Sequence, residues 1–224
     1  MKFPKKLEKG QTVGLVAPSS AIETERVAMC VDKIQEMGYK VKVADNLDNN
    51  YHNFVAGPAK VRADWVNKMF ADPEVDAVFC VRGGDGSAWI MEYLDEEVIK
   101  ANPKPFLGYS DITNLHLFIN EKCGFGTFHG PMVSSNMVEN FDEETERSFY
   151  EILNGEGEID FWNPAGKELE TITPGKAEGT LAGGNLTLVS DAIGTFYDLD
   201  PTGKIIFLED IHSSTAVLRG ICIT

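Results

Sequence analysis

Long apolar runs and positive charge are both scarce in this sequence. No apolar run is long enough to span a bilayer, so we expect no membrane-spanning segment. The first six residues are partly basic, but no apolar stretch follows them, and a secretory signal is therefore not expected. With 20 Lys and Arg against 35 Asp and Glu, the formal net charge is −15. Such a surface repels phosphate backbones and anionic lipids, so we expect no binding to nucleic acid or to a membrane surface.

Cysteines are also few, and no two of them are spaced like metal ligands. The four residues, Cys30, Cys80, Cys123 and Cys222, lie far apart along the chain. Cys30 and Cys80 fall in apolar periodic segments. We interpret all four as reduced, mostly buried thiols of a cytoplasmic protein.

The pattern that is present is that of an α/β protein. The 224 residues are 43% hydrophobic and 25% charged, which suits one large domain, or one domain and part of a second. Apolar runs at 12–18, 39–44 and 75–81 predict buried strands, and helical spacing at 23–37 and 59–71 predicts helices between them. This order favours a parallel sheet with right-handed crossovers, and we interpret the polar segment 45–58 as a loop.

A glycine-rich turn, Arg82-Gly83-Gly84-Asp85-Gly86-Ser87, follows the strand predicted at 75–81. Such a turn lets a ligand approach the backbone and presents amide groups to a phosphate, a carboxylate or an oxyanion. The alternative is a tight turn with a purely structural role. The Gly-x-Gly-x-x-Gly and Gly-Lys-Ser/Thr fingerprints are both absent, so no nucleotide motif supports a nucleotide site.

Gly108-Tyr109-Ser110-Asp111 lies between a short apolar run at 104–107 and a segment with helical spacing at 112–119. A serine between a strand end and a helix start is placed like a nucleophile elbow, with the free N–H groups of the helix beside it. Those groups and the helix dipole favour an oxyanion. The alternative is that Ser110 or Asp111 caps the helix. The motif also departs from Gly-x-Ser-x-Gly, because Asp111-Ile112 follows the serine.

Two further residues stand at predicted strand ends. His129 ends a short strand at 127–131, and it is either a base or a hydrogen-bonded structural histidine. The apolar strand at 204–208 runs into Glu209-Asp210. This pair is either a positioned carboxylate or a turn in which Asp210 caps a helix.

The character of the chain changes after a helix predicted at 142–153. Asn154-Gly155-Glu156-Gly157 ends that helix, and short β-like pieces at 159–162 and 169–172 follow. Residues 179–185 then lead into a helix predicted at 186–193. We predict an α/β domain over 1–157 and a smaller β-rich domain over 158–224.

Several of these motifs occur in the order seen in one enzyme family, and the match runs from about residue 10 to 212. The chain resembles the serine LD-carboxypeptidases, which include the peptidases that confer self-immunity to microcin-type nucleotide antibiotics. The matching motifs are Val13-Gly14-Leu15-Val16-Ala17-Pro18-Ser19, Ala71-Asp72-Pro73-Glu74-Val75-Asp76-Ala77-Val78, Arg82-Gly83-Gly84-Asp85-Gly86-Ser87, Gly108-Tyr109-Ser110-Asp111-Ile112-Thr113, Phe128-His129-Gly130-Pro131-Met132, Gly183-Gly184-Asn185-Leu186 and Phe207-Leu208-Glu209-Asp210.

The resemblance implies a fold and a reaction. It implies a Rossmann-like parallel α/β domain, a smaller β-rich C-terminal domain and a cytoplasmic homodimer. It also implies a Ser-Glu-His triad with Ser110 as nucleophile and Glu209 as its acidic member, working without a metal or a cofactor. Family carboxypeptidases remove the terminal D-amino acid from L,D-linked murein tetrapeptides during cell-wall recycling.

The remaining site residues follow from the same motifs. The backbone N–H groups of Gly84 and Asp111 match the oxyanion hole. We assign substrate binding to Arg82, Gly83 and Asp85, with Arg82 meeting the terminal carboxylate of the peptide because it stands at a strand end.

One family residue has no counterpart in this sequence. The triad histidine lies well beyond the glutamate in the family, whereas this chain ends at Thr224. The four histidines, His52, His116, His129 and His212, do not match that position. We therefore expect a truncated or frameshifted chain with an incomplete second domain, and an activity reduced by the missing base.

Three other functions stay open on the sequence. The first is a microcin-immunity peptidase acting on peptidyl-nucleotides, for which Phe161 or Trp162 could supply an aromatic platform. The second is a non-catalytic module that binds muropeptides. The third is a nucleotide-dependent Rossmann oxidoreductase.

Overall fold

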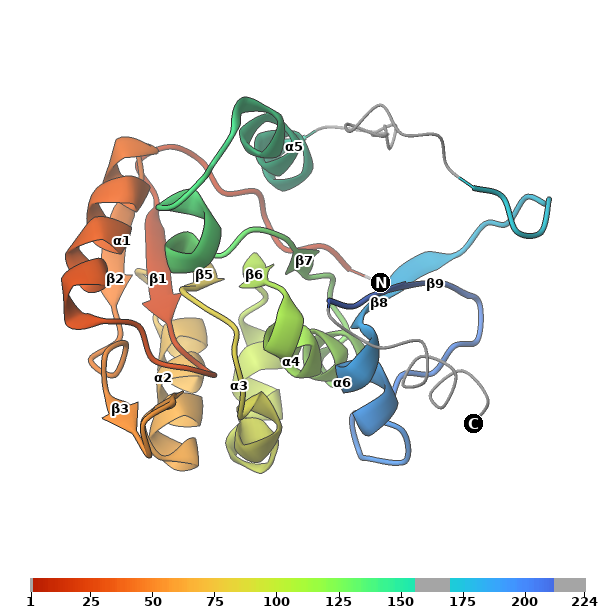
Figure 1. Cartoon of the computed structure of the whole chain (residues 1–224), viewed down its shortest axis with the longest axis horizontal. Helices are drawn as coiled ribbons and strands as arrows, with labels where there is room; N and C mark the ends of the chain where they lie inside the picture. The colour runs from red at the N-terminus through yellow and green to blue at the C-terminus, as the bar shows by residue number, and fades with distance from the viewer. Residues whose placement is uncertain (1, 156–169, 212–224) are drawn as a thin grey trace.

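The centre of the molecule is a parallel sheet of five strands in the order β2-β1-β5-β6-β7 (Figure 1). The structure is a computed structural model that describes residues 2–155 and 170–211. The strands of this sheet are β1 (Thr12–Val16), β2 (Lys40–Val43), β5 (Ala77–Cys80), β6 (Phe106–Gly108) and β7 (Phe128–His129). From β1 the chain crosses to β2 on one side, and it returns past β1 to β5 on the other. The carboxyl ends of β1 and β5 therefore form a topological switch point, where open α/β sheets bind ligands.

Helices surround this sheet. They are α1 (Thr24–Glu36), α2 (Ala59–Ala71), α3 (Glu96–Ala101), α4 (Thr113–Phe118), α5 (Glu143–Asn154) and α6 (Leu186–Asp191), with the 3₁₀ turns η1 (Ser87–Tyr93) and η2 (Ser110–Ile112) and the π turns η3 (Ile119–Cys123) and η4 (Val133–Met137). Helix α2 packs on β1, β5 and α3, and α1 packs on β2 and η4. The crossovers run in opposite directions, which places α1 and α2 on opposite faces of the sheet.

The main helices form where apolar residues recur at helical spacing. Helix α2 buries Ala63, Val66 and Phe70, and α1 buries Cys30 and Ile34. Burying one such face removes apolar surface from water, and each large side chain contributes about 1.5–3 kcal/mol. The sequence predicted α2 at its observed bounds and α1 to within one residue at each end.

A second, smaller sheet lies beside the first. Strands β8 (Thr180–Asn185) and β9 (Lys204–Glu209) pair in parallel, with α6 between them in the chain, and both β8 and α6 pack on α4 (Figure 1). The α/β class and a small C-terminal sheet agree with the prediction. The boundary predicted at 157/158 and the β-like piece at 159–162 lie outside the described residues.

Some predicted elements differ from the structure. Segment 45–58 is not only a loop, because β3 (Asn50–Tyr51) and β4 (Val55–Ala56) form a short antiparallel hairpin in it. Residues 170–172 are not in a strand, and Ile172 is 93% exposed, so nothing in the described chain pairs with this piece. The segment after the glycine turn has apolar residues at helical spacing, Trp89, Ile90, Tyr93 and Leu94, which indicate a helix, and it forms the 3₁₀ turn η1.

The three cysteines that the structure describes are buried thiols, as the sequence predicted. Cys30, Cys80 and Cys123 are free and buried, and burial raises the pKa of each, to about 12 for Cys123. Cys222 lies outside the described residues. Within 2–155 and 170–211 no helix has both the length and the apolar character needed to cross a membrane.

Candidate active site

Ser110 stands on a sharp turn between β6 and η2. Its φ is +62°, in the left-handed region that non-glycine residues rarely adopt. The residue that caps η2 is Tyr109, and it makes no side-chain cap hydrogen bond. The structure therefore favours the elbow over the capping alternative, because a strained serine at a strand end exposes its hydroxyl at the edge of the sheet.

The side chain of Asp111 is a buried anchor for this elbow. It is 5% exposed, and its carboxylate accepts hydrogen bonds from the Ser19 hydroxyl at 2.5 Å and from the Ser87 N–H at 2.9 Å. The Ser87 hydroxyl donates to the Asp111 carbonyl oxygen at 2.6 Å. Burial raises the pKa of the Asp111 carboxyl, and these hydrogen bonds oppose the shift. The Asp111 side chain thus ties the elbow to Ser19, just after β1, and to Ser87, the first residue of η1.

The glycine turn lies against the elbow. A Cβ placed on Gly83 would stand 3.2 Å from the Ser110 Cβ. Gly84 has a φ of +111°, and a Cβ there would approach the Ser20 hydroxyl oxygen to 2.1 Å. Ser20 holds the turn in return, since its N–H donates to Gly83 O at 3.2 Å and its hydroxyl accepts from Asp85 N–H at 3.2 Å. The structure thus brings Ser110 and the turn together, with Asp85 exposed at its tip.

Arg62 supports the same turn from inside the protein, and sequence reasoning missed it. Its guanidinium is 1% exposed and donates to three carbonyl oxygens, those of Gly57 at 2.9 Å, Gly86 at 2.8 Å and Pro18. Burial lowers its pKa, and the charges of Asp111 and Asp85 act in the opposite direction. A buried arginine that binds three backbone segments fixes their relative positions.

Glu209 ends β9 close to His129 at the end of β7. The His129 Nε2 lies 3.8 Å from the Glu209 Oε1, and the His129 ring centroid is 5.1 Å from that of Phe207. Burial raises the pKa of Glu209, as does the charge of Asp210, and burial lowers the pKa of His129. Both shifts favour the neutral forms of the two groups. The Asp210 carboxylate accepts from the Thr187 hydroxyl at 2.9 Å, and the residues that it was expected to cap lie outside the described part of the chain.

The small sheet is held against the elbow by backbone and side-chain contacts. The N–H of Asn185 donates to the Thr113 hydroxyl at 3.1 Å, and Asn185 faces Glu209 in the β8–β9 register. A Cβ on Gly184 would come within 2.8 Å of the Thr113 side chain, so this contact requires glycine. The Asn185 side chain opposes the rise in the Glu209 pKa that burial causes, but does not outweigh it. Asn185 is a second site residue that sequence reasoning missed.

The other histidines have distinct surroundings. His116 is 2% exposed, with Nε2 2.8 Å from Gly108 O and Nδ1 2.8 Å from the Thr127 hydroxyl. Because a carbonyl only accepts, Nε2 carries the proton, and burial lowers the His116 pKa to about 3. His116 therefore holds the strand end before the elbow as a neutral group. His52 is exposed in its hairpin, and His212 lies outside the described residues.

Two models of known protein families match this sequence. The sequence model described as the LD-carboxypeptidase N-terminal domain matches residues 13–130, which hold the elbow and the glycine turn. The chain belongs to the LD-carboxypeptidase family. The model of the LD-carboxypeptidase C-terminal domain matches residues 178–221, which hold Asn185 and Glu209.

Individual LD-carboxypeptidases and their relatives are similar over most of this chain. A probable murein peptide carboxypeptidase of Bacillus subtilis is 39% identical over 93% of this chain, and the chain spans 65% of that relative's length. The microcin C7 self-immunity protein MccF of Escherichia coli is 29% identical over 95% of this chain and 70% of its own. The structure of MccF in complex with aspartyl sulfamoyl adenosine superposes with a TM-score of 0.85 at 25% identity, covering 99% of this chain and 74% of that one.

The described part of the chain offers no cluster suited to a metal. Within 2–155 and 170–211, no group of three or more His, Cys, Asp or Glu side chains could hold an ion.

Proposed function

We propose that this protein is a serine hydrolase that removes the terminal D-amino acid from L,D-linked murein peptides. The observation that carries the proposal is the φ of +62° at Ser110 beside a glycine turn. The Ser110 hydroxyl attacks the carbonyl carbon of the scissile amide and forms a tetrahedral intermediate. Loss of the D-amino acid leaves an acyl-enzyme, which water hydrolyses to regenerate the serine.

Two groups in the site support this reaction. The backbone N–H groups of Gly84 and Asp111 would stabilise the oxyanion, and one such donor contributes about 3 kcal/mol in other serine hydrolases. In the family a histidine oriented by the glutamate that matches Glu209 takes the serine proton and passes it to the leaving amine, and none of the four histidines of this sequence matches its position. The family resemblance implies that base, and in the described residues the Glu209 carboxylate contacts His129.

Similarity to the probable murein peptide carboxypeptidase of B. subtilis supports this substrate class. A second candidate function is hydrolysis of peptidyl-nucleotide amides, which the likeness to MccF with bound aspartyl sulfamoyl adenosine favours. The aromatic residues suggested for that role, Phe161 and Trp162, lie outside the described residues. A two-domain division at 157/158, a cytoplasmic location and a homodimer belong to the same proposal.

Mass spectrometry of the products tests the reaction directly. The purified protein is incubated with an L,D-linked tetrapeptide, with its all-L counterpart and with a peptidyl-nucleotide amide. We expect the first to lose one D-alanine and the second to stay intact. Cleavage of the nucleotide alone would support the second function, and cleavage of none of the three, while the tetrapeptide still binds, would support the non-catalytic module.

Substitution of Gly84 is expected to reduce turnover more than stability. Gly84→Ala must relieve a contact of 2.1 Å with Ser20 and adopt a φ of +111°, so the turn shifts and its N–H leaves the oxyanion. We expect kcat for the L,D-linked peptide to fall by about 10²-fold, the size typical of losing one oxyanion donor. Steady-state kinetics on the folded variant measures this.

Gly124→Ala is the matched control. Gly124 has a φ of +77° and open space around a Cβ, far along the chain from the turn. Gly124→Ala therefore destabilises the backbone by about 1 kcal/mol, as any alanine at positive φ does, but it leaves the site undisturbed. Equal losses of kcat in the two variants would exclude an oxyanion role for the turn.

A further inference from the structure

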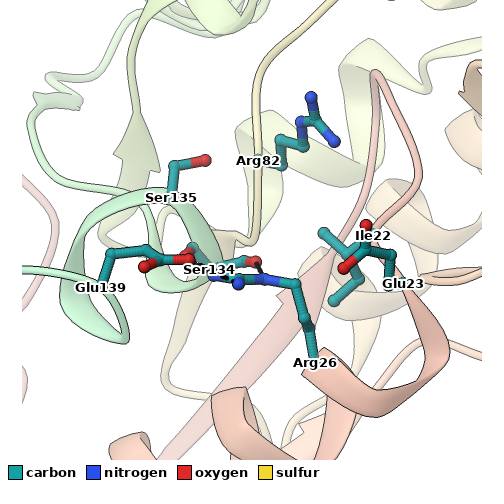
Figure 2. A pocket seen from close by; sticks show the side chains of 7 residues that line it. All are labelled: Ile22, Glu23, Arg26, Arg82, Ser134, Ser135 and Glu139. Atoms are coloured by element: carbon teal, nitrogen blue, oxygen red, sulfur yellow. Dashed lines mark hydrogen bonds and ion pairs between the residues drawn. The ribbon is translucent and has the colours of Figure 1, made fainter.

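One cluster of charged side chains near the carboxyl end of β5 is paired within the protein. It lines a cavity of about 260 Å³ between α1 and η4 (Figure 2). The Arg26 Nε donates to the Ser134 hydroxyl at 2.7 Å, and its Nη1 pairs with a Glu139 carboxylate oxygen at 2.5 Å. Arg82, expected to bind substrate, lines the same cavity and donates to Ala21 O at 3.3 Å. The Arg26 charge is therefore balanced, and this cluster holds η4 against α1.

A second pair of ionisable groups, His129 and Glu209, differs from this cluster. The His129 Nε2 lies 3.8 Å from the Glu209 Oε1, which is about 1 Å longer than a direct hydrogen bond. Among residues 2–155 and 170–211, the buried Glu209 Oε1 has no hydrogen-bond donor, and neither ring nitrogen of His129 makes a hydrogen bond. Buried carboxylate oxygens are nearly always hydrogen-bonded, so an unpaired one beside an imidazole points to a role for that imidazole.

Three other rings surround the His129 ring. Its centroid lies 5.1 Å from that of Phe207, 5.9 Å from that of His116 and 6.0 Å from that of Tyr109. These neighbours come from three parts of the fold, since Phe207 lies on β9, His116 lies on α4 and Tyr109 begins the elbow. The His129 side chain is 24% exposed. A ring packed in this way has few orientations, and in the one observed its Nε2 faces the carboxylate.

His129 also connects the two sheets that carry the site. It ends β7 and pairs with Gly108 of β6, two residues before Ser110. Glu209 ends β9 in the small sheet. A hydrogen bond from the His129 Nε2 to the carboxylate would therefore hold the orienting acid at a fixed place relative to the nucleophile.

The protonation states of the two groups suit a donor on His129. Burial lowers the pKa of His129, so its neutral ring carries one N–H at pH 7. Burial and the charge of Asp210 raise the pKa of Glu209, and an N–H donated to the carboxylate favours its ionised form. The other ionisable side chains that face the His129 ring are those of Tyr109 and His116, and burial keeps His116 neutral.

We propose that His129 is a positioning residue that donates its Nε2–H to the Glu209 Oε1 and so fixes this carboxylate for catalysis at Ser110. The inference rests on the proposed function and adds a residue to it. Hydrogen bonds in active sites are often long in the free enzyme and shorten when substrate binds, and the 3.8 Å separation is of that kind. Because a carboxylate oxygen accepts more than one hydrogen bond, His129 leaves Glu209 able to orient a base as well.

Two substitutions of His129 test this role kinetically. His129→Leu removes the donor, whereas His129→Gln supplies a side-chain N–H that does not titrate. The control is His52→Asn, which removes an exposed imidazole at a φ of +53° that asparagine tolerates. We expect His129→Leu to lower kcat for the L,D-linked peptide by about tenfold at an unchanged KM, and to move the acidic limb of the kcat/KM profile to higher pH.

The glutamine variant distinguishes positioning from other roles. His129→Gln should recover most of kcat together with the wild-type acidic limb, and His52→Asn should behave as wild type. If His129→Gln is as inactive as His129→Leu, the imidazole itself takes part in proton transfer and the positioning role is wrong. If His129→Leu loses stability but keeps the wild-type kcat and acidic limb, the residue is structural and the inference is likewise wrong.

A titration that needs no activity separates this inference from the hydrolase proposal. The carboxyl resonance of Glu209 is followed by NMR against pH in wild type, in both His129 variants and in His52→Asn. We expect Glu209 to titrate at higher pH in His129→Leu than in the other proteins, because its carboxylate has lost a donor. If this holds while wild type cleaves no peptide, the contact stands and the hydrolase proposal fails. If Glu209 titrates alike in all of them, His129 does not act on it, and the inference fails whatever the activity.

Discussion

Ser110→Ala is expected to abolish release of the D-amino acid from the L,D-linked peptide, because a site without its nucleophile keeps only binding and the oxyanion donors. The same position also allows a test of backbone strain. Ser110 has a φ of +62°, which costs about 1–2 kcal/mol for a residue with a Cβ. Ser110→Gly should therefore be as inactive as Ser110→Ala and yet have a larger free energy of unfolding, by about 0.5–1 kcal/mol after the greater chain entropy of glycine is counted.

Denaturant unfolding of both variants measures the difference. Ser148, inside helix α5, provides the control because its backbone is helical. There glycine should be less stable than alanine by about 1 kcal/mol, which is the opposite sign. If Ser110→Gly is the less stable of the two at position 110 as well, the elbow carries no strain. If Ser110→Ala keeps wild-type activity, Ser110 is not the nucleophile.

The second prediction with a large expected effect concerns the stability of the protein at acidic pH. We expect the stability of the protein to fall as the pH is lowered from about 6.5 toward 3, through His116. Burial lowers the pKa of His116 from its ordinary 6.5 to about 3, so the unfolded chain binds a proton in this range that the folded protein does not. Each pH unit below 6.5 costs about 1.4 kcal/mol, which gives about 2 kcal/mol at pH 5.

Other buried groups also change how stability depends on pH, and their contributions have to be distinguished from that of His116. The lowered pKa of His129 acts in the same direction. The raised pKa values of Asp111 and Glu209 act in the opposite direction, because each contributes stability that is present at low pH and is lost as the pH rises through the folded pKa. The absolute curve is therefore a sum of several titrations.

His116→Gln isolates the histidine. Glutamine can donate to Gly108 O and accept from Thr127, and it does not titrate. We expect wild type to be the more stable at pH 7, and the gap in unfolding free energy to shrink by about 2 kcal/mol by pH 5. Chemical denaturation at several pH values measures both curves. Parallel curves for the two proteins would show that His116 does not cause the acid sensitivity.

Much of the fold could be predicted because strong periodicity marks it. Helix α2 and strands β1, β2 and β5 lie in apolar segments long enough for their spacing to indicate the element. Strand β8 was missed because Gly183 and Gly184 carry no strand signal. Gly183 has a φ of +130°, and a Cβ there would lie 1.9 Å from Phe207 O, so the residue is glycine to let β9 approach. Such a requirement depends on a partner strand that local sequence does not show.

The site was predicted in part for the same reason. Ser110 and the glycine turn each follow a recognisable strand, and motif order linked them to Glu209. His129 and Glu209 lie 80 positions apart in the chain, and no sequence spacing predicts that they meet. Asn185 contacts the site only because β8 docks on α4. Arg62 lies mid-helix like a surface arginine, and only the packed structure shows that it is buried.

The buried Arg62 also bears on how the molecule assembles. The carbonyl oxygens of Pro18, Gly57 and Gly86 accept from one guanidinium carried by α2, so the segments that hold Pro18 and Gly86 can complete their hydrogen bonding only when α2 has docked on the sheet. We therefore expect the glycine turn to reach its final geometry only after α2 has packed on the sheet, although no residue of α2 is assigned a catalytic role.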